Sequence, residues 1–246
     1  MSASPSLTWL SQSGYLLERD GVRVVIDPYL SDAAKAKGAT RVVPAPMDAA
    51  ALTPDLLVIT HHHVDHWDPF GAPEIMRAHP RCRLLAPASV RLLARASGIS
   101  DDRIKALDVG ESITAGPYQV TALPTLHSDP YGVGLLLRVG DVTIYHSGDT
   151  EYTSALARDI SARLASLAPR LDLALLCING RLGNMSWREA GLLAETLQPR
   201  LAIPNHYDLF AENQADPAPF LERCALLGLP ARTLFIGQPF FPATPS

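Results

Sequence analysis

One short segment of the chain gathers five side chains that could bind a metal ion. Residues 60–66 read THHHVDH and follow the apolar run Leu56–Thr60, which has the character of a buried strand. Imidazole nitrogens and carboxylate oxygens are the ligands that Zn²⁺, Mn²⁺ and Fe²⁺ take in proteins, with positions left open for water. Burying these groups without partners or a metal would cost several kcal/mol. The segment therefore predicts a metal site in preference to a structural histidine cluster.

The spacing gives the side chains of this segment different positions. His61 and His63 are two residues apart and would point to the same side of an extended backbone, so they can share one cation. Asp65 and His66 follow in a turn and can reach a second cation across a bridging water. His62 alternates to the opposite side, and we expect it to be a packing residue and not a ligand.

Three more ligand-type residues stand beyond the ends of other apolar runs. They are His127 after 118–123, Asp149 after 142–145, and His206 after 201–203. Taken singly, each is as consistent with a structural role as with metal binding. Because side chains from several strand ends can converge on one edge of a sheet, the three together can complete the ligand set begun at residues 61–66.

The surrounding sequence predicts the strands and helices that must position these groups. The predicted strands are 7–10, 15–18, 22–26, 56–60, 83–86, 104–107, 118–123, 133–139, 142–145, 171–178, 201–203 and 233–235. The predicted helices are 71–78, 89–97, 153–167, 187–197 and 217–227. Each half of the chain, 1–116 and 117–238, thus runs from a β-meander into alternating helices and strands. A four-layer αββα sandwich of the α+β class, with two mixed sheets face to face and helices outside, satisfies this order.

The chain is predicted to form a single domain over residues 1–246, because no linker rich in glycine or serine divides it. The stretch 31–53 is rich in alanine, proline and lysine, and we expect it to be an insertion or a lid. The proline-rich tail 239–246 is expected to be frayed.

The composition predicts a proper apolar core and no polyanionic partner. Apolar residues make up 47% of the 246 residues, and the formal net charge is −4 at pH 7. Nucleic acid is therefore not an expected partner. The first ten residues lack the regions of a signal peptide, no apolar stretch is long enough for a membrane span, and the three cysteines fit reduced thiols. We expect a cytoplasmic protein with no membrane partner, and a homo-oligomer is left open.

The order of these motifs resembles the metallo-β-lactamase superfamily across nearly the whole chain. The resemblance implies one or two divalent ions, Zn or Mn, per chain. It implies one metal held by His61, His63 and His127, a second held by Asp65, His66 and His206, and Asp149 as the bridge between them. Asp27 ends a strand at an Asp-Pro turn, where it could simply form the turn. The resemblance favours a second role, as the acceptor of a ligand histidine's N–H.

Several segments resemble the L-ascorbate-6-phosphate lactonase branch of that superfamily. They are WLSQSG at 9–14, IDPYL at 26–30, INGR at 178–181, GNMS at 183–186, Glu189-Ala190, and PNHYDLF at 204–210. Asn179, Arg181 and Asn184 are the candidate substrate-binding residues. The Arg181 guanidinium could grip a carboxylate or phosphate with two parallel hydrogen bonds, or it could brace its own loop. Only Leu182 separates the INGR and GNMS segments, whereas that branch carries an insertion between them. We therefore expect a small anionic substrate.

The expected function is a lactonase-like hydrolase of ester bonds that acts on a small anionic molecule. A metal ion lowers the pKa of bound water from about 15.7 to about 7. Asp65 is the candidate catalytic residue, placed to orient that water and move its proton. Two alternatives stay open: a phosphodiesterase that uses the same centre, and a non-catalytic metal-binding sensor or scaffold.

Overall fold

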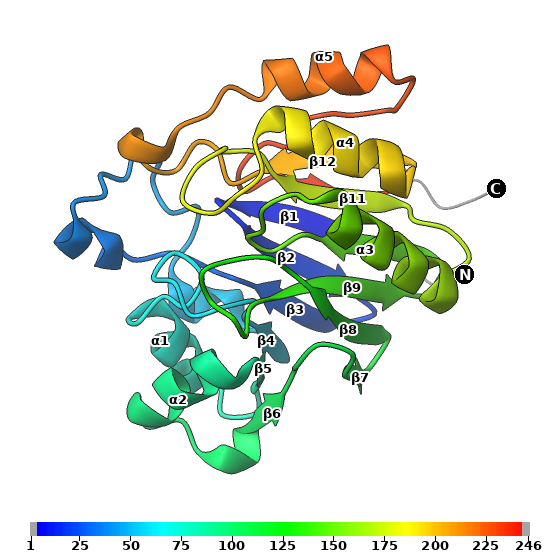
Figure 1. Cartoon of the computed structure of the whole chain (residues 1–246). Coiled ribbons are helices and arrows are strands. Elements are labelled where there is room, and N and C mark those ends of the chain that lie inside the picture. The colour runs from blue at the N-terminus through cyan, green and yellow to red at the C-terminus, as the bar shows by residue number, and fades with distance from the viewer. Residues whose placement is uncertain (1–3, 243–246) are drawn as a thin grey trace.

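The computed structural model describes residues 4–242. Two β-sheets lie face to face, and helices cover their outer faces (Figure 1). The first sheet has seven strands, in the spatial order β13 (Pro239–Phe240), β1 (Ser6–Ser11), β2 (Gly14–Arg19), β3 (Val22–Ile26), β4 (Leu56–Val58), β5 (Arg83–Ala86) and β6 (Ile104–Ala106). The second has six, in the order β12 (Leu201–Asn205), β11 (Leu173–Cys177), β10 (Val142–His146), β9 (Val133–Val139), β8 (Tyr118–Pro124) and β7 (Ser112–Ala115). Within the described residues, no helix is both long and apolar enough to cross a bilayer.

Both sheets are mixed, and they repeat one pattern of strand directions. In the first sheet the strands from β13 to β3 pair antiparallel, and those from β3 to β6 pair parallel. In the second sheet the strands from β7 to β10 pair antiparallel, and those from β10 to β12 pair parallel. It follows that β8, β10 and β12 run in the same direction and end at one edge of the sheet. The α+β sandwich with two mixed sheets, predicted from the sequence, is confirmed.

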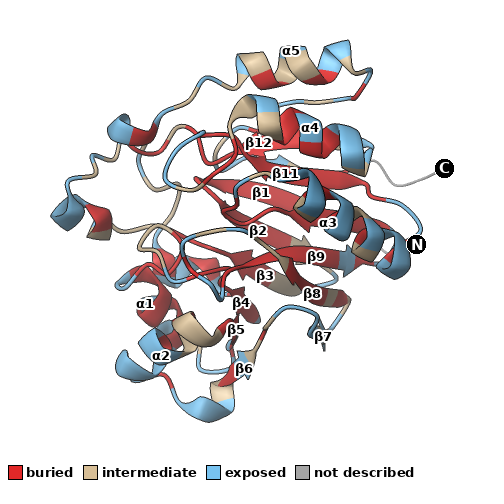
Figure 2. Cartoon of the chain, viewed as in Figure 1, coloured by how far each residue is buried: buried red, intermediate tan, exposed pale blue. Residues whose placement is uncertain are grey.

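The first sheet separates two apolar cores. Val24 and Ile26 of β3 belong to the core between the sheets, whereas Val25 faces the helices, because side chains alternate across a strand. The core between the sheets extends to α3 (Ser154–Leu167), α4 (Trp187–Leu197) and α5 (Ala218–Leu226), and the other core lies under α1 (Gly71–Ala78) and α2 (Ala88–Ala96). The central strands are buried, the strands β6, β7 and β13 at the ends of the sheets are partly exposed, and the helices are buried on one side and exposed on the other (Figure 2). The layers are therefore helix, sheet, sheet, helix.

The end of the chain differs from the sequence-based expectation. Residues 233–235, predicted as a strand, are not one, because this part of the chain pairs with β12 only through a bridge between Ala202 and Ala231. The chain then turns at Gly237, whose φ of 74° suits glycine, and Pro239–Phe240 pairs with β1. The expectation of a frayed tail over 239–246 is thus wrong at its start, since proline is tolerated as the first residue of an edge strand. Residues 243–246 lie outside the described residues.

The stretch 31–53 is held to the rest of the protein by side chains and by a main-chain bridge between Arg41 and Phe210. It contains two short 3-10 helices, η1 (Ala33–Lys37) and η2 (Ala49–Leu52). Arg41 Nη2 donates to the carbonyl oxygens of Tyr29 and Ser31, each at 2.9 Å. Thr40 donates through its N and its Oγ1 to the Glu212 carboxylate, both at 2.8 Å. Although it has no long strand or helix, this stretch has a defined path over the protein.

A buried carboxylate joins this stretch to the start of α1. Asp68 accepts hydrogen bonds from Leu30 N, Ser31 N, Ser31 Oγ, Phe70 N and Gly71 N, at distances between 2.6 and 3.0 Å. Gly71 is required at this point, since a Cβ there would lie 2.7 Å from Asp68 Oδ2. One side chain therefore satisfies the main-chain donors of two segments that are distant in the sequence.

Asp68→Asn should lower the free energy of unfolding by about 2 kcal/mol, because the amide NH₂ cannot accept from main-chain N–H groups whichever way it is turned. Urea unfolding followed by circular dichroism measures the change. Asp48→Asn is the matched control: Asp48 is exposed, precedes η2 and makes no capping bond with its side chain. Its effect should stay within about 0.5 kcal/mol. Equal effects of the two changes would show that the Asp68 bonds add no net stability.

Candidate metal centre

Four loops bring ligand-type side chains to one edge of the sandwich. Residues 61–66 follow β4 of the first sheet, while His127, Asp149 and His206 follow β8, β10 and β12 of the second. Because those three strands run in one direction, the loops that leave them meet at the same edge and face the loop after β4. Strand direction is therefore the cause of the convergence that the sequence predicted.

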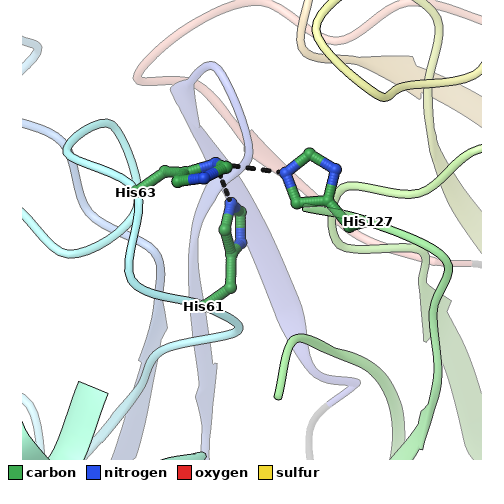
Figure 3. A group of neighbouring side chains, drawn as sticks. All are labelled: His61, His63 and His127. Carbon is green, nitrogen blue, oxygen red and sulfur yellow. Dashed lines mark hydrogen bonds between the residues drawn. The ribbon is translucent and has the colours of Figure 1, made fainter. Parts of the chain in front are cut away.

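Three histidines form one group of facing imidazoles (Figure 3). His63 Nδ1 lies 3.1 Å from His61 Nε2 and 3.1 Å from His127 Nε2. Nitrogens that lie ~2.0–2.1 Å from a tetrahedral Zn²⁺ stand about 3.3 Å apart, so this spacing suits three ligands of one ion. Residues 64–66 form the turn that was expected around Asp65 and His66, whereas residues 62 and 63 form a bend and not the extended backbone expected between His61 and His63.

A second group lies beside the first and shares a carboxylate with it. His206 Nε2 and His66 Nε2 lie 3.4 and 3.8 Å from Asp65 Oδ2. Asp149 Oδ1 is 3.2 Å from His66 Nε2, and Asp149 Oδ2 is 3.1 Å from His206 Nε2 and 3.9 Å from His127 Nε2. The structure thus brings all the predicted ligands together, in groups of three whose ligand atoms lie within 4.8 Å of one another, and it places Asp149 between them.

Further hydrogen bonds orient the imidazole rings. The buried Asp27 carboxylate lies 2.7 Å from His66 Nδ1, and it accepts from Thr60 N at 2.8 Å and from Thr60 Oγ1 at 2.5 Å. His127 Nδ1 donates to the Gly183 carbonyl oxygen, 2.9 Å away. Engaging one ring nitrogen in this way turns the other toward the centre and sets which nitrogen can bind a metal. Asp27 makes the contact that was expected of a carboxylate behind a ligand histidine.

Two imidazole rings of the first group, those of His61 and His63, are neutral at physiological pH. Burial, and after it the positive charge of His66, hold the pKa of His61 well below its usual value. Burial, and after it His127, lowers the pKa of His63 to about 4. Neutral imidazoles carry the lone pairs that a metal requires, so these rings are ready to act as ligands.

The second group carries charge of both signs. Burial by itself would lower the pKa of His66 and of His206, but Asp149 and Asp65 outweigh it and raise the pKa well above the usual value for His66 and to about 9 for His206. Burial would raise the pKa of Asp149, yet the two imidazolium rings hold it well below its usual value. The carboxylates are therefore ionised and paired with protonated rings, whose protons a metal ion would have to displace.

Three buried atoms of the ligand-type residues have no hydrogen-bond partner within residues 4–242: His66 Nε2, Asp149 Oδ1 and His206 Nδ1. The first two form an ion pair 3.2 Å apart without hydrogen-bond geometry. An imidazole nitrogen beside a carboxylate oxygen is a donor pair that Zn²⁺ and Mn²⁺ both accept, so the residues present fit a divalent cation.

The three predicted substrate-binding residues lie in different surroundings. Asn184 lies at the centre and donates to Asp149 Oδ2 at 2.8 Å. Asn179 is buried and donates to the carbonyl oxygen of Arg181 at 3.2 Å. Arg181 is exposed, and its Nη1 donates to the Glu212 carbonyl oxygen at 3.0 Å, a contact suited to bracing its loop. Of the three, Asn184 is the one that lines the cavity over the centre.

A cavity of about 720 Å³ lies over the centre and brings in a residue that the sequence did not single out. Its walls are formed by Lys37, His63, Val64, Asp65, Leu126, His127, Ser128, Asp149, Glu151, Leu182, Gly183, Asn184, His206 and Asn213. Lys37 lies on η1, within the stretch 31–53. No local pattern distinguishes it from Lys35, and only the path of the stretch brings it to the cavity.

Gln12 is a second residue that sequence reasoning missed. Its Nε2 donates to Asp65 Oδ2 at 2.7 Å and lies 3.1 Å from His206 Nε2. Gln12, Asp27 and His206 have φ values of 50°, 41° and 61°, a conformation that costs a non-glycine residue about 1–2 kcal/mol. His206 N donates to Gln12 O at 3.0 Å, so two of these residues hold each other in place. Backbone strain of this kind gathers at functional sites.

The loops that carry the first group are tied together behind the centre. The buried Asp129 carboxylate lies 2.6 Å from His62 Nδ1 and accepts from His62 N at 3.1 Å and from Ser89 Oγ at 2.6 Å. His62 is therefore engaged by Asp129, while its ring also contacts the edge of the His63 ring, with the centroids 4.9 Å apart. Because Asp129 follows His127 by two residues, this carboxylate fixes the His127 loop against the loop that holds His61.

Comparison with known proteins agrees with this fold. Residues 22–207 match the model of the family described as Beta-lactamase superfamily domain. The UPF0173 metal-dependent hydrolase of Methanopyrus kandleri is 29% identical over 241 residues, which cover 94% of this chain and 96% of that protein. Igni18, described as a novel metallo hydrolase from Ignicoccus hospitalis, has a TM-score of 0.75 at 24% identity, over 97% of this chain and 98% of its own. CmlA, a diiron β-hydroxylase from Streptomyces venezuelae, has a TM-score of 0.72 at 18% identity, over 97% and 54%.

The two solved structures show the fold alone. One is described as a hydrolase and the other as a hydroxylase, so the sandwich by itself does not decide the reaction. The family model spans most of the chain and includes every loop of the centre, from His61 to His206. The chain therefore belongs to the beta-lactamase superfamily.

Proposed function

We propose that the chain is a metal-dependent hydrolase that opens a lactone or cleaves an ester of a small anionic substrate. The observation that carries the proposal is the cluster of imidazoles and carboxylates at the wall of the 720 Å³ cavity, where Asp65 also lies. The name of the Methanopyrus kandleri relative, a metal-dependent hydrolase, supports hydrolysis. The resemblance to the L-ascorbate-6-phosphate lactonase branch supports a lactone as the bond attacked.

The residues that would hold one or two Zn or Mn ions are those of the two groups. His61, His63 and His127 would hold one ion, Asp65, His66 and His206 the other, and Asp149 would lie between. Bound there, a divalent cation supplies a water molecule of lowered pKa and an electrophile for the carbonyl oxygen. The protein would orient both through the rings that Asp27 and Gly183 fix.

Asp65 is placed to handle the proton of the reaction. Burial would raise its pKa, but the positive charges of His66 and His206 hold that pKa well below its usual range, so the group stays ionised. Gln12 Nε2 engages its Oδ2, which fixes the orientation of the carboxylate. As the water oxygen bonds to the carbonyl carbon, Asp65 would accept its proton and deliver it to the leaving oxygen when the C–O bond breaks.

The position of one lysine on the cavity wall supports an anionic substrate. Of the lysines and arginines in residues 4–242, Lys37 alone lines this cavity, and its ammonium has no hydrogen-bond or ion-pair partner in that part of the chain. Glu151 lines the same cavity with the opposite charge, so an anionic group would lie on the Lys37 side. Arg181 is engaged by Glu212 and is not available in this arrangement.

Protein reconstituted with Zn²⁺ or Mn²⁺ should hydrolyse members of a panel of lactones and carboxylic esters. Asp65→Asn should retain metal, measured by elemental analysis, and lower kcat by roughly 100-fold, as expected for loss of a proton-handling group. Asp159→Asn is the control, since Asp159 lies on the exposed side of α3 and pairs only with Arg163.

Bis-p-nitrophenyl phosphate belongs in the same panel. Hydrolysis of this diester without hydrolysis of lactones or esters would replace the proposal with a phosphodiesterase. A metal-loaded protein that turns over no member of the panel would point to a sensor or scaffold.

Metal binding near pH 7.5 should release about two protons per chain. The raised pKa of His66 and the pKa of about 9 for His206 leave both rings protonated without metal, and a metal can bind them only after deprotonation. Calorimetry in buffers of different ionisation enthalpy counts the protons, and affinity should weaken as the pH falls. Release of no protons would mean that the second group does not take part in binding.

Lys37→Met should raise KM for anionic substrates by about three- to fivefold and leave kcat unchanged, since an exposed ion pair contributes up to ~1 kcal/mol. Lys35→Met is the matched control, because Lys35 is exposed on the same 3-10 helix but does not line the cavity. Steady-state kinetics with anionic and neutral analogues measures the effect. An equal rise in KM for both kinds of substrate would show that Lys37 does not recognise the anion.

A further inference from the structure

A second cavity, of about 470 Å³, lies next to the cavity over the metal centre. Its walls come from η1, from the loop between residues 62 and 70, and from the end of α2, which lie on the same side of the molecule (Figure 1). The wall includes the large apolar side chains of Trp67, Phe70 and Leu93, and also Ala36 and Ala96. Ligand-binding cavities in proteins have this range of volumes and this mainly apolar character.

The two cavities share part of their walls. Lys37 and Val64 line both of them, so the boundary between the cavities is formed by these two side chains. Val64 lies within the ligand loop itself, between His63 and Asp65. A substrate whose reacting bond lies over the ligands can therefore extend past Val64 into the second cavity without leaving the protein surface.

The polar groups of the second cavity are already engaged. Asp32 pairs with Arg41 at 3.1 Å, and His62 Nδ1 lies 2.6 Å from the buried Asp129 carboxylate. The wall is therefore apolar where Trp67, Phe70 and Leu93 lie, and its charged and polar side chains, Lys37, Asp32 and His62, lie beside that apolar part. Phe70 is 66% exposed and Leu93 is 36% exposed, so apolar area remains that a ligand could cover.

We propose that this second cavity binds an apolar part of the substrate, an alkyl chain or an aromatic ring, while the ester or lactone group lies at the metal centre. The inference rests on the proposed hydrolysis and narrows its substrate to an amphipathic molecule. Val64 separates the reacting end from the apolar end, and Lys37 meets an anionic group at the junction. Burial of each additional methylene by Leu93 and Phe70 then strengthens binding.

The test uses metal-loaded, full-length protein and a series of γ-lactones with longer alkyl substituents, γ-valerolactone, γ-octalactone and γ-decalactone. We expect kcat/KM to rise at least tenfold along the series. This is much less than full burial of the longer chains would give, since each fully buried methylene contributes a factor of roughly four. Leu93→Glu should abolish the rise. Leu92→Glu should preserve it, because Leu92 is the preceding residue on α2 and is 65% exposed, but does not line the cavity.

A binding measurement separates this inference from the proposed reaction. Decanoate should bind the wild type at least tenfold more tightly than butyrate in calorimetry, and Leu93→Glu should remove the difference. If neither lactones nor carboxylic esters are hydrolysed, the proposed reaction fails, and the decanoate result alone decides on the cavity. Equal kcat/KM along the series together with equal binding of both acids would overturn the inference. A dependence on chain length that is the same in Leu93→Glu and in Leu92→Glu would also overturn the inference.

A second variant covers the case in which Leu93→Glu does not fold, as judged by circular dichroism. Ala96→Trp would fill the same cavity from the exposed end of α2 without burying a charge. It should lower kcat/KM for γ-decalactone at least tenfold and leave that for γ-valerolactone within about twofold. Equal effects on the two lactones would overturn the inference.

Discussion

The negative charge of Asp149 is the constraint on which the centre depends. Asp149 is only 6% exposed, its carboxylate lies between two groups of imidazoles, and a buried carboxylate is stable only beside positive charge. His66 and His206 supply that charge as imidazolium, and a divalent cation can supply it when these rings give up their protons. The hydrogen bond from Asn184 is compatible with both arrangements. Protons and metal ions are thus alternative counter-charges for a single group.

This balance of charge is possible because of strand direction. Three strands of the second sheet, β8, β10 and β12, end at the same edge, and β4 of the first sheet ends opposite them. The ligands come from distant parts of the sequence and meet only once both sheets have formed. The backbone strain at Gln12, Asp27 and His206 falls at this edge, where long-range pairing of the strands is available to hold it.

Much of the fold, and the convergence of the ligand-type residues, was predictable because the signals are local or periodic. The apolar run Val24, Val25, Ile26 predicts a strand with two buried faces, and THHHVDH marks the loop after another strand, β4, from composition alone. The errors arose where structure depends on long-range contacts. Residues 233–235 have the composition of a strand but form none, since the bridge to β12 is made by Ala231, whereas Pro239–Phe240 pairs with β1. Lys37 lines the cavity because of the path of the stretch 31–53, and the sequence of this stretch has no periodic pattern from which that path could be predicted.

The way in which the stretch 31–53 is attached has a consequence for how its sequence can vary among related proteins. Residues 31–53 contribute to the walls of both cavities and are fastened by Asp68, by Glu212 and by a main-chain bridge between Arg41 and Phe210, yet they contribute no strand to either sheet. Because the stretch adds no strand to either sheet, a change in its length or composition would leave the strand order, and with it the strand ends that carry the ligand-type residues, unaltered. Variation of this one segment would therefore reshape the cavities more readily than variation of any strand.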